Sequence, residues 1–304
     1  MEPSLSVDIA GIKMKNPVMT ASGTFGSGVE YSDFVDLSKL GAIVTKGVTL
    51  NERLGNPTPR IYETPCGMLN SIGLQNKGVE AFIREDLKFL EKFDVPVIVN
   101  IAGSTIEEYT RVAERLSEES MVKGLELNIS CPNVKDGGLA FGASVKSAVK
   151  VTSAVRKTTR LPLIVKLSPN VGNIVDIAKG VEDVGADAVS LINTLIGMAI
   201  DINSFEPQLA NVFGGLSGPA VKPIAVAMVW QVSQAVDIPV IGMGGIINAE
   251  DALEFFLVGA KAIAVGTANF IYPEATIKII NGLREFLKKS DFKNISDIIN
   301  KVKV

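Results

Sequence analysis

Eight short apolar runs recur along the chain, and each is followed by a segment long enough for an amphipathic helix. The runs are rich in β-branched residues and almost continuously apolar, which is typical of parallel strands buried on both faces. Alternating strand and helix patterns predict parallel βαβ units, and eight such units favour a closed (β/α)8 TIM barrel of the α/β class. The runs cover residues 16–22, 41–46, 95–102, 124–130, 161–168, 186–193, 238–245 and 262–267.

The rest of the chain is consistent with one barrel. Residues 5–17 resemble a β-hairpin that turns at Ala10 and Gly11 and could close the bottom of the barrel. The 304 residues exceed a usual domain length, but closed α/β barrels reach this size as one unit. We therefore expect residues 1–304 to form a single domain, with inserted loops at the C-terminal face of the barrel.

Charge and hydropathy exclude several partners. The net charge is -3, with Lys+Arg 30 against Asp+Glu 33, and no basic run could displace counterions from DNA or RNA. The N-terminal segment lacks the pattern of a secretory signal, and no stretch has the length needed to span a bilayer. We expect a cytoplasmic protein that binds neither nucleic acid nor membrane.

The absence of histidine restricts the chemistry most. Because the chain contains no histidine, it cannot use a Ser-His-Asp triad, a histidine-ligated metal or an imidazole base. Cys66 and Cys131 are too few for a disulfide framework or a cysteine-only zinc site, so a reducing compartment and no metal are expected. Proton transfer must then use Cys, Lys, Tyr or a carboxylate. Cys66 lies in the apolar context TPCGML, which favours a packing role.

Polar residues or glycines end the expected strands. Loops at the C-terminal face hold the active site in essentially every characterised barrel enzyme. Polar residues end strands in many proteins, but three Asn and two Lys at equivalent ends of different strands favour a function. The residues are Ser22, Lys46, Asn100, Asn128, Lys166 and Asn193, with glycine turns at Gly244, Gly245, Gly266 and Thr267.

Three connections are longer than the usual βα loop of about 2 to 6 residues. They cover residues 47–75, 131–142 and 195–218, and we interpret them as lids or binding loops. The second begins with Cys131, directly after the fourth strand and close to Asn128 and Asn133. A lone cysteine is more often an inert core residue, but here it is the best available base or nucleophile.

The other polar residues suit a planar anionic ligand. Asparagine offers both a donor and an acceptor, so a ring of asparagines matches alternating N–H and C=O groups. Lys46 and Lys166 could each stabilise an anion, and a Schiff base is the competing role. Backbone N–H groups of the last two glycine turns could cradle a phosphate. The candidate ring consists of Asn70, Asn128, Asn133 and Asn193.

The motifs NISCPN, MLNSIGLQNKG, VTKG at 44–47, GMGG and AVGT resemble class 1 dihydroorotate dehydrogenase, in order and over nearly the whole chain. The resemblance implies FMN at the barrel mouth and Cys131 as the base that removes a proton from C5 of dihydroorotate while hydride leaves C6 for flavin N5, with Lys46 also catalytic. The implied cofactor positions are Ser22, Lys46, Gly47, Asn100, Asn128, Lys166, Ile192, Gly218, Gly244, Gly245, Gly266 and Thr267. The implied substrate positions are Lys46, Asn70, Ser71, Ile72, Gly73, Leu74, Asn128, Asn133, Asn193 and Thr194.

The loops GLQNKG and CPNVKDGGLAFG resemble the type B enzymes of this family. That resemblance implies oxidation of dihydroorotate to orotate in pyrimidine biosynthesis, with NAD+ as the final acceptor. It also implies a homodimer core with an electron-transfer subunit, together a heterotetramer. FAD and an iron-sulfur cluster would belong to that partner, because this chain has no cluster ligands and no dinucleotide fingerprint.

Four alternatives remain open at the level of sequence. A type A enzyme would use fumarate instead of NAD+. A flavin-free barrel lyase would form a Schiff base at Lys46 or Lys166, and a non-catalytic scaffold would show no turnover. A tRNA-reducing flavin barrel is disfavoured by the acidic charge balance.

Overall fold

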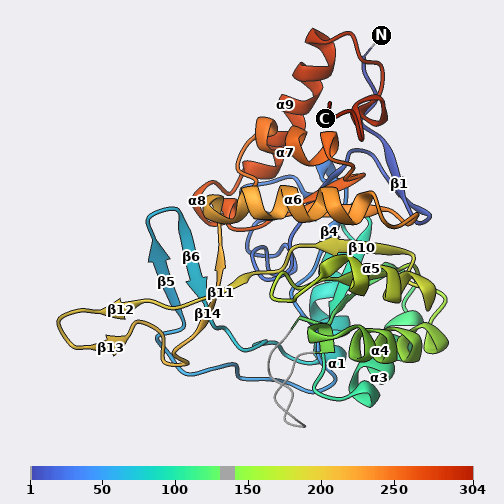
Figure 1. The fold of residues 1–304 in the computed structure, drawn as a ribbon. Coiled ribbons are helices and arrows are strands. Elements are labelled where there is room, and N and C mark those ends of the chain that lie inside the picture. The colour runs from blue at the N-terminus through green and yellow to red at the C-terminus, as the bar shows by residue number, and fades with distance from the viewer. Residues whose placement is uncertain (1, 131–140, 304) are drawn as a thin grey trace.

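The computed structural model describes residues 2–130 and 141–303 (Figure 1). Cys131 and Asn133 therefore lie outside the described residues. The eight predicted strands form one parallel sheet in the order β3-β16-β15-β10-β9-β8-β7-β4. A bridge between Met19 and Ala42 joins its two edge strands, so the sheet closes into the predicted barrel. The strands are β3 (Val18–Thr20), β4 (Ile43–Val44), β7 (Val97–Ile101), β8 (Val122–Asn128), β9 (Leu163–Lys166), β10 (Ala188–Leu191), β15 (Val240–Met243) and β16 (Ala262–Val265).

Helices cover the outside of the barrel (Figure 1). In α3 (Ile106–Ser117) the side chain of Thr105 accepts from the N–H of Glu108 and caps the first turn. Tyr109, Val112 and Leu116 recur at helical spacing on one face of α3 and are buried against the barrel. The helices are α1 (Val79–Ala81), the π-helical segment Phe82–Leu87, α2 (Lys88–Leu90), α3 (Ile106–Ser117), α4 (Val145–Thr158), α5 (Ile174–Asp183), α6 (Lys222–Ser233), α7 (Ala249–Leu257), α8 (Ala268–Ile271) and α9 (Ala275–Lys289).

The predicted N-terminal hairpin is present and closes one end of the barrel. Strand β1 (Val7–Ile9) pairs antiparallel with β2 (Ile12–Met14), and both turn residues have the positive φ that a tight two-residue turn requires. Ile9, Ile12 and Met14 form a buried cluster with apolar residues of the barrel strands. The opposite end, where the strands terminate, remains available for a ligand.

Two of the long connections form an additional sheet instead of irregular loops. Strands β5 (Ile61–Thr64), β6 (Gly67–Asn70), β11 (Leu195–Gly197) and β14 (Gly214–Ser217) form a four-stranded antiparallel sheet, and β12 (Ile200–Asp201) pairs with β13 (Glu206–Pro207). We call residues 61–70 and 195–217 the arm. Figure 1 shows the arm projecting to one side of the barrel, beside its C-terminal strand ends.

The predicted packing role of Cys66 is wrong. Cys66 is exposed at the turn between β5 and β6, and its carbonyl accepts from the N–H of Ala220 at 3.0 Å. The apolar neighbours that suggested burial belong to a hairpin, in which Leu69 is buried while the turn faces solvent. Among the described residues, no helix has the length and apolar character needed to cross a membrane.

Candidate active site

A cavity of about 1010 Å³ lies at the carboxyl ends of the barrel strands and extends beneath the arm. Eighteen of the predicted site residues line it, although they come from segments spread over the chain. Among the described residues, Asn100 is the one predicted site residue that does not line the cavity. The lining residues among those predicted are Ser22, Lys46, Gly47, Asn70, Ser71, Ile72, Gly73, Leu74, Asn128, Lys166, Ile192, Asn193, Thr194, Gly218, Gly244, Gly245, Gly266 and Thr267.

One end of the cavity is a cradle of backbone N–H groups. Gly245 has a φ of 75°, and a Cβ there would lie 2.9 Å from the carbonyl oxygen of Gly218. Within the described chain, the N–H groups of Gly245 and Thr267 donate to no other group. Free N–H groups that line a concave surface next to helix α8 suit a phosphate. The cradle therefore fits a phosphate group of a bound ligand.

Lys46 follows β4 and is half-buried in the wall of the cavity. Burial lowers the pKa of its ammonium group, and the positive charge of Arg60 lowers this pKa further. The carboxylates of Glu30 and Asp86 partly oppose the shift. A partly desolvated cation at this point attracts an anionic ligand group more strongly than an exposed lysine would.

Lys166 and Asn100 belong to a buried polar cluster below the cavity. Lys166 is 5 % exposed, and its Nζ lies 4.0 Å from Oε2 of Glu126. The Nδ2 of Asn100 donates to Oε2 of Glu126 at 2.6 Å, and the hydroxyl of Ser190 donates to Oε1 at 2.8 Å. The sequence analysis missed Glu126, although a charged residue within the apolar run GLELNIS was a visible signal.

In three of the predicted ring asparagines, one end of the side-chain amide is hydrogen-bonded to the backbone. The Nδ2 of Asn70 donates to the carbonyl of Gly215 at 3.3 Å. The Oδ1 of Asn128 accepts from the N–H of Ser130 at 3.2 Å. The Oδ1 of Asn193 accepts from the N–H of Thr194 at 2.8 Å. Within the described chain the other end of each amide has no partner and can pair with a ligand.

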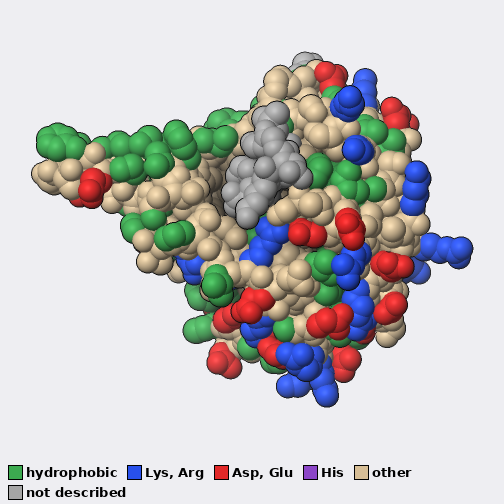
Figure 2. All heavy atoms as spheres, turned by 90° about the horizontal axis from the view of Figure 1, so that it is seen from below, with side chains coloured by type: hydrophobic (Ala, Val, Ile, Leu, Met, Phe, Trp, Pro, Cys, Tyr) green, Lys and Arg blue, Asp and Glu red, His purple; other side chains and the backbone are tan. Residues whose placement is uncertain are grey.

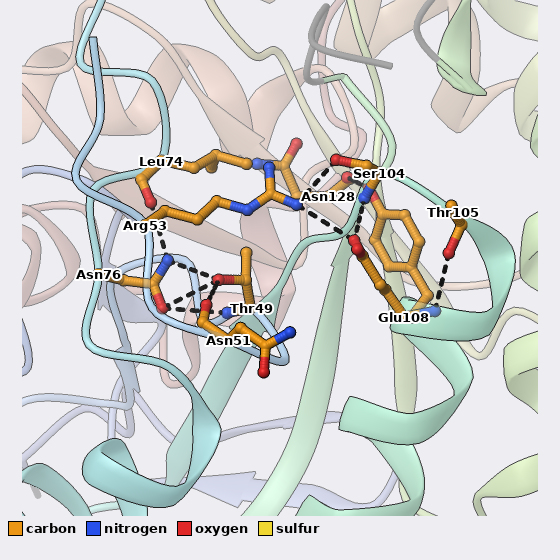
Figure 3. A network of polar contacts seen from close by, with 10 residues as sticks. Thr49, Asn51, Arg53, Leu74, Asn76, Ser104, Thr105, Glu108 and Asn128 are labelled. Carbon is orange, nitrogen blue, oxygen red and sulfur yellow. Dashed lines mark hydrogen bonds and ion pairs between the residues drawn. The ribbon is translucent and has the colours of Figure 1, made fainter. Parts of the chain in front are cut away.

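The loop that follows β6 is held in place by a network of polar contacts (Figure 3). Leu74 has a φ of 57°, and its carbonyl accepts from Nδ2 of Asn76 at 2.8 Å. The Oδ1 of Asn76 accepts from the N–H of Gly78 at 2.8 Å and from the N–H of Thr49 at 3.2 Å. Asn76 thus ties the loop that carries residues 71–74 to the segment that follows Lys46.

We expect Asn76→Ala to raise the KM for the substrate about 10-fold without reducing the amount of bound cofactor. Removal of a side chain with several buried partners leaves them unpaired, at about 1 to 3 kcal/mol each. Steady-state kinetics and cofactor content check this outcome. Asn51→Ala is the matched control. The hydroxyl of Thr49 donates to the backbone carbonyl of Asn51, so this hydrogen bond does not depend on the Asn51 side chain. An unchanged KM in Asn76→Ala would contradict the assigned role.

Further lining residues were not predicted from the sequence. Arg60 donates to Oε1 of Gln75 at 2.5 Å, and both line the cavity. Asn170 donates to the carbonyl of Thr194 at 2.9 Å and accepts from the N–H of Ile196 at 3.0 Å, which fixes the base of the arm. These residues lie outside the expected strand ends, so only the folded chain brings them to the cavity.

A closed barrel with an anion cradle and an amide-lined cavity at its C-terminal face defines a ligand-binding barrel enzyme. Residues 4–287 match the family model described as Dihydroorotate dehydrogenase. The chain therefore belongs to the dihydroorotate dehydrogenase family, and this membership implies flavin-dependent catalysis.

Relatives with curated names are similar over the whole chain. A protein of Geotalea uraniireducens is 58% identical over 298 residues, which cover 98% of each chain. One from Thermoanaerobacter pseudethanolicus is 56% identical and covers 99% of each. Both are named dihydroorotate dehydrogenase B (NAD(+)), catalytic subunit, so the resemblance to type B is confirmed. The name "catalytic subunit" implies a further subunit in those proteins.

A solved structure shows the same fold. The dihydroorotate dehydrogenase of Eimeria tenella, in complex with ferulenol, superimposes with a TM-score of 0.82. The superposition covers 98% of this chain and 88% of that one at 22% sequence identity. At this identity the likeness supports the barrel architecture alone.

Proposed function

We propose that this chain oxidises dihydroorotate to orotate with FMN in pyrimidine biosynthesis, and that electrons pass to NAD+ through a partner subunit. One observation carries the proposal. A single cavity gathers the glycine cradle, two lysines and three of the ring asparagines in a chain whose 58% identical relative is an NAD+-linked catalytic subunit. The cytoplasmic location expected from the sequence remains a prediction.

The described residues suit FMN and a planar substrate. Bound FMN would supply the hydride acceptor. The N–H groups of Gly245 and Thr267 would hold its phosphate, and Lys166 would stabilise negative charge on its ring. The free amide ends of the asparagines would orient the substrate ring, and Lys46 would hold its carboxylate.

The purified chain tests this function directly. It should be yellow and should bleach when dihydroorotate is added without oxygen. The chain alone should then reduce artificial dyes but not NAD+, because the second flavin and the iron-sulfur cluster belong to the partner. A colourless preparation that cannot be reconstituted with FMN would refute the proposal, and efficient fumarate reduction by the isolated chain would indicate a type A enzyme.

The lowered pKa of Lys46 predicts an alkaline limit for substrate binding. The ammonium group holds the substrate carboxylate only while protonated, and it loses its proton at a lower pH than an ordinary lysine does. We therefore expect the KM for dihydroorotate to rise as the pH increases through this lowered pKa. Lys46→Arg should move the rise to higher pH, because arginine stays charged. The pH profile of kcat/KM measures both, and an identical alkaline limb in the two proteins would contradict the role of Lys46.

The arm supports the proposed homodimer core. Figure 2 shows hydrophobic side chains along this projection, whereas charged side chains cover the body of the protein. Ile202 is 79% exposed and Phe205 is 84% exposed, and several other apolar residues of the arm are also exposed. A contiguous apolar patch of this kind marks an association surface in most proteins. The residues are Ile61, Tyr62, Ile196, Met198, Ile200, Ile202, Phe205, Val212 and Phe213.

We expect the double variant Ile202→Ser and Phe205→Ser to be a monomer under conditions in which the wild-type chain is a dimer. Burial of each of these side chains in a dimer interface would stabilise the dimer by about 1.5 to 3 kcal/mol, and the double variant loses this contribution on both copies. Sedimentation velocity measures the mass. Phe34→Ser is the matched control, because Phe34 is 60% exposed outside the arm. A double variant that stays dimeric would place the interface elsewhere.

A further inference from the structure

Glu126 lies in the middle of β8, inside the barrel and only 2% exposed. Its carboxylate contacts one residue from each of three strands, namely Asn100 on β7, Lys166 on β9 and Ser190 on β10. A buried carboxylate is costly to fold unless partners satisfy it. This one adds nothing to the apolar core, yet two of its contacts are residues assigned above to the cofactor site.

The carboxylate determines how the amide of Asn100 is turned. An ionised carboxylate can only accept hydrogen bonds, so Asn100 must present its NH2 group to Glu126. Its Oδ1 then points away from Glu126, is fully buried and has no hydrogen-bond partner among residues 2–130 and 141–303. A Cβ on Gly47, which lines the cavity, would lie 3.1 Å from this oxygen. A buried acceptor without a partner, directly behind a residue that lines the cavity, is suited to a ligand N–H group that approaches at Gly47.

The same carboxylate also acts on Lys166. The distance of 4.0 Å between Nζ and Oε2 is that of an ion pair in a site almost closed to water. In such surroundings the charge of Glu126 offsets much of the positive potential that Lys166 projects into the cavity. Glu126 therefore sets both the orientation of an acceptor and the net charge below the ligand.

We propose that Glu126 is a positioning residue for the flavin site. It holds Asn100 with Oδ1 as the acceptor for a ring N–H group, and it balances the charge of Lys166 next to the ring. This inference rests on the proposed function. It assigns to Glu126 no contact with cofactor or substrate.

Glu126→Gln tests the proposal, because it keeps the size of the side chain and removes the charge. A neutral amide can donate or accept, so Asn100 is no longer held in one orientation, and the Kd of FMN for the apoprotein should rise about 10-fold or more. The charge of Lys166 is then unbalanced and stabilises the reduced ring, so the midpoint potential of bound FMN should shift to more positive values. Fluorescence titration and spectroelectrochemistry measure the two quantities, and neither depends on turnover.

Ser190→Ala is the matched control. It removes the remaining hydrogen bond of the carboxylate and leaves Asn100 and Lys166 in place. Its FMN Kd and midpoint potential should stay near those of the wild type. If Ser190→Ala shifts the potential as much as Glu126→Gln does, the effect comes from general loosening of the barrel interior and the proposal is overturned.

Glu126→Asp covers the case in which the glutamine variant does not fold. It keeps the charge but shortens the side chain, so the hydrogen bond to Asn100 should weaken. We expect the Kd of FMN to rise about 10-fold and the midpoint potential of bound FMN to stay near that of the wild type. An unchanged Kd in Glu126→Asp overturns the proposal, and so does an unchanged or more negative potential in Glu126→Gln. If the wild-type chain itself binds no FMN, the proposed function fails, and this result differs from every outcome above.

Discussion

Replacing Cys131 with alanine is expected to leave FMN bound but to slow its reduction by dihydroorotate about 10²- to 10⁴-fold. This is the range that a positioned general base contributes. The chain has no histidine, and a thiol with an unperturbed pKa of about 8.5 is the candidate base closest to neutrality. The rate of anaerobic bleaching of the flavin, measured by rapid mixing, checks the expectation.

Cys66→Ala is the matched control, because Cys66 is the other cysteine of the chain and is exposed at the turn of the arm. It should bleach at the wild-type rate. The bleaching rate of Cys131→Ser should lie between those of Cys131→Ala and the wild type at neutral pH. It should increase as the pH rises, because a hydroxyl is a much weaker acid than a thiol. A bleaching rate near that of the wild type in Cys131→Ala would mean that another group removes the proton.

Gly245→Ala is expected to weaken FMN binding at least about 100-fold. A residue with a Cβ is disfavoured at a φ of 75° by about 1 to 2 kcal/mol. The added carbon would also lie 2.8 Å from Cβ of Lys222 and 2.9 Å from the backbone oxygen of Gly218, so the cradle must open. A factor of 100 corresponds to about 2.7 kcal/mol, which these two effects together can supply. Titration of the apoprotein with FMN measures the change.

Gly172→Ala separates loss of the cradle from the mere addition of a methyl group. Gly172 is not among the residues that line the cavity, and no atom lies within 4 Å of an added Cβ. We expect its affinity for FMN to stay within about a few-fold of the wild-type value. Equal affinity in both variants would mean that the backbone at Gly245 does not shape the phosphate site. Thermal unfolding of the apoproteins must show that both variants are folded.

The regular part of the molecule could be predicted because its signals are local. Each barrel strand is an apolar run of a few residues, and each of the eight runs contains or overlaps one strand of the closed sheet. Parallel strands terminate at a common end, so polar residues at those termini converge on one cavity without any further information. This is why residues as distant as Ser22 and Thr267 line the same cavity.

The arm could not be predicted, because its pairing is not local. Strand β6 pairs with β14, in which Asn70 lies opposite Gly215. Neither segment has the continuous apolar pattern of the barrel strands, because each is a strand of 4 residues of which only one is fully buried. For the same reason Cys66 was assigned to the interior, whereas it lies at the turn of a projecting hairpin.

The sequence by itself determined the barrel, the glycine turns and the residue types available for proton transfer, because these depend on short-range pattern and composition. It also predicted Asn100 at the cofactor, but the orientation of this buried amide depends on its hydrogen bond to Glu126 on another strand. Only the tertiary structure decided which polar groups meet across strands β7 to β10. A hydrogen bond between side chains on different strands depends on register and barrel closure, and neither is encoded within one segment.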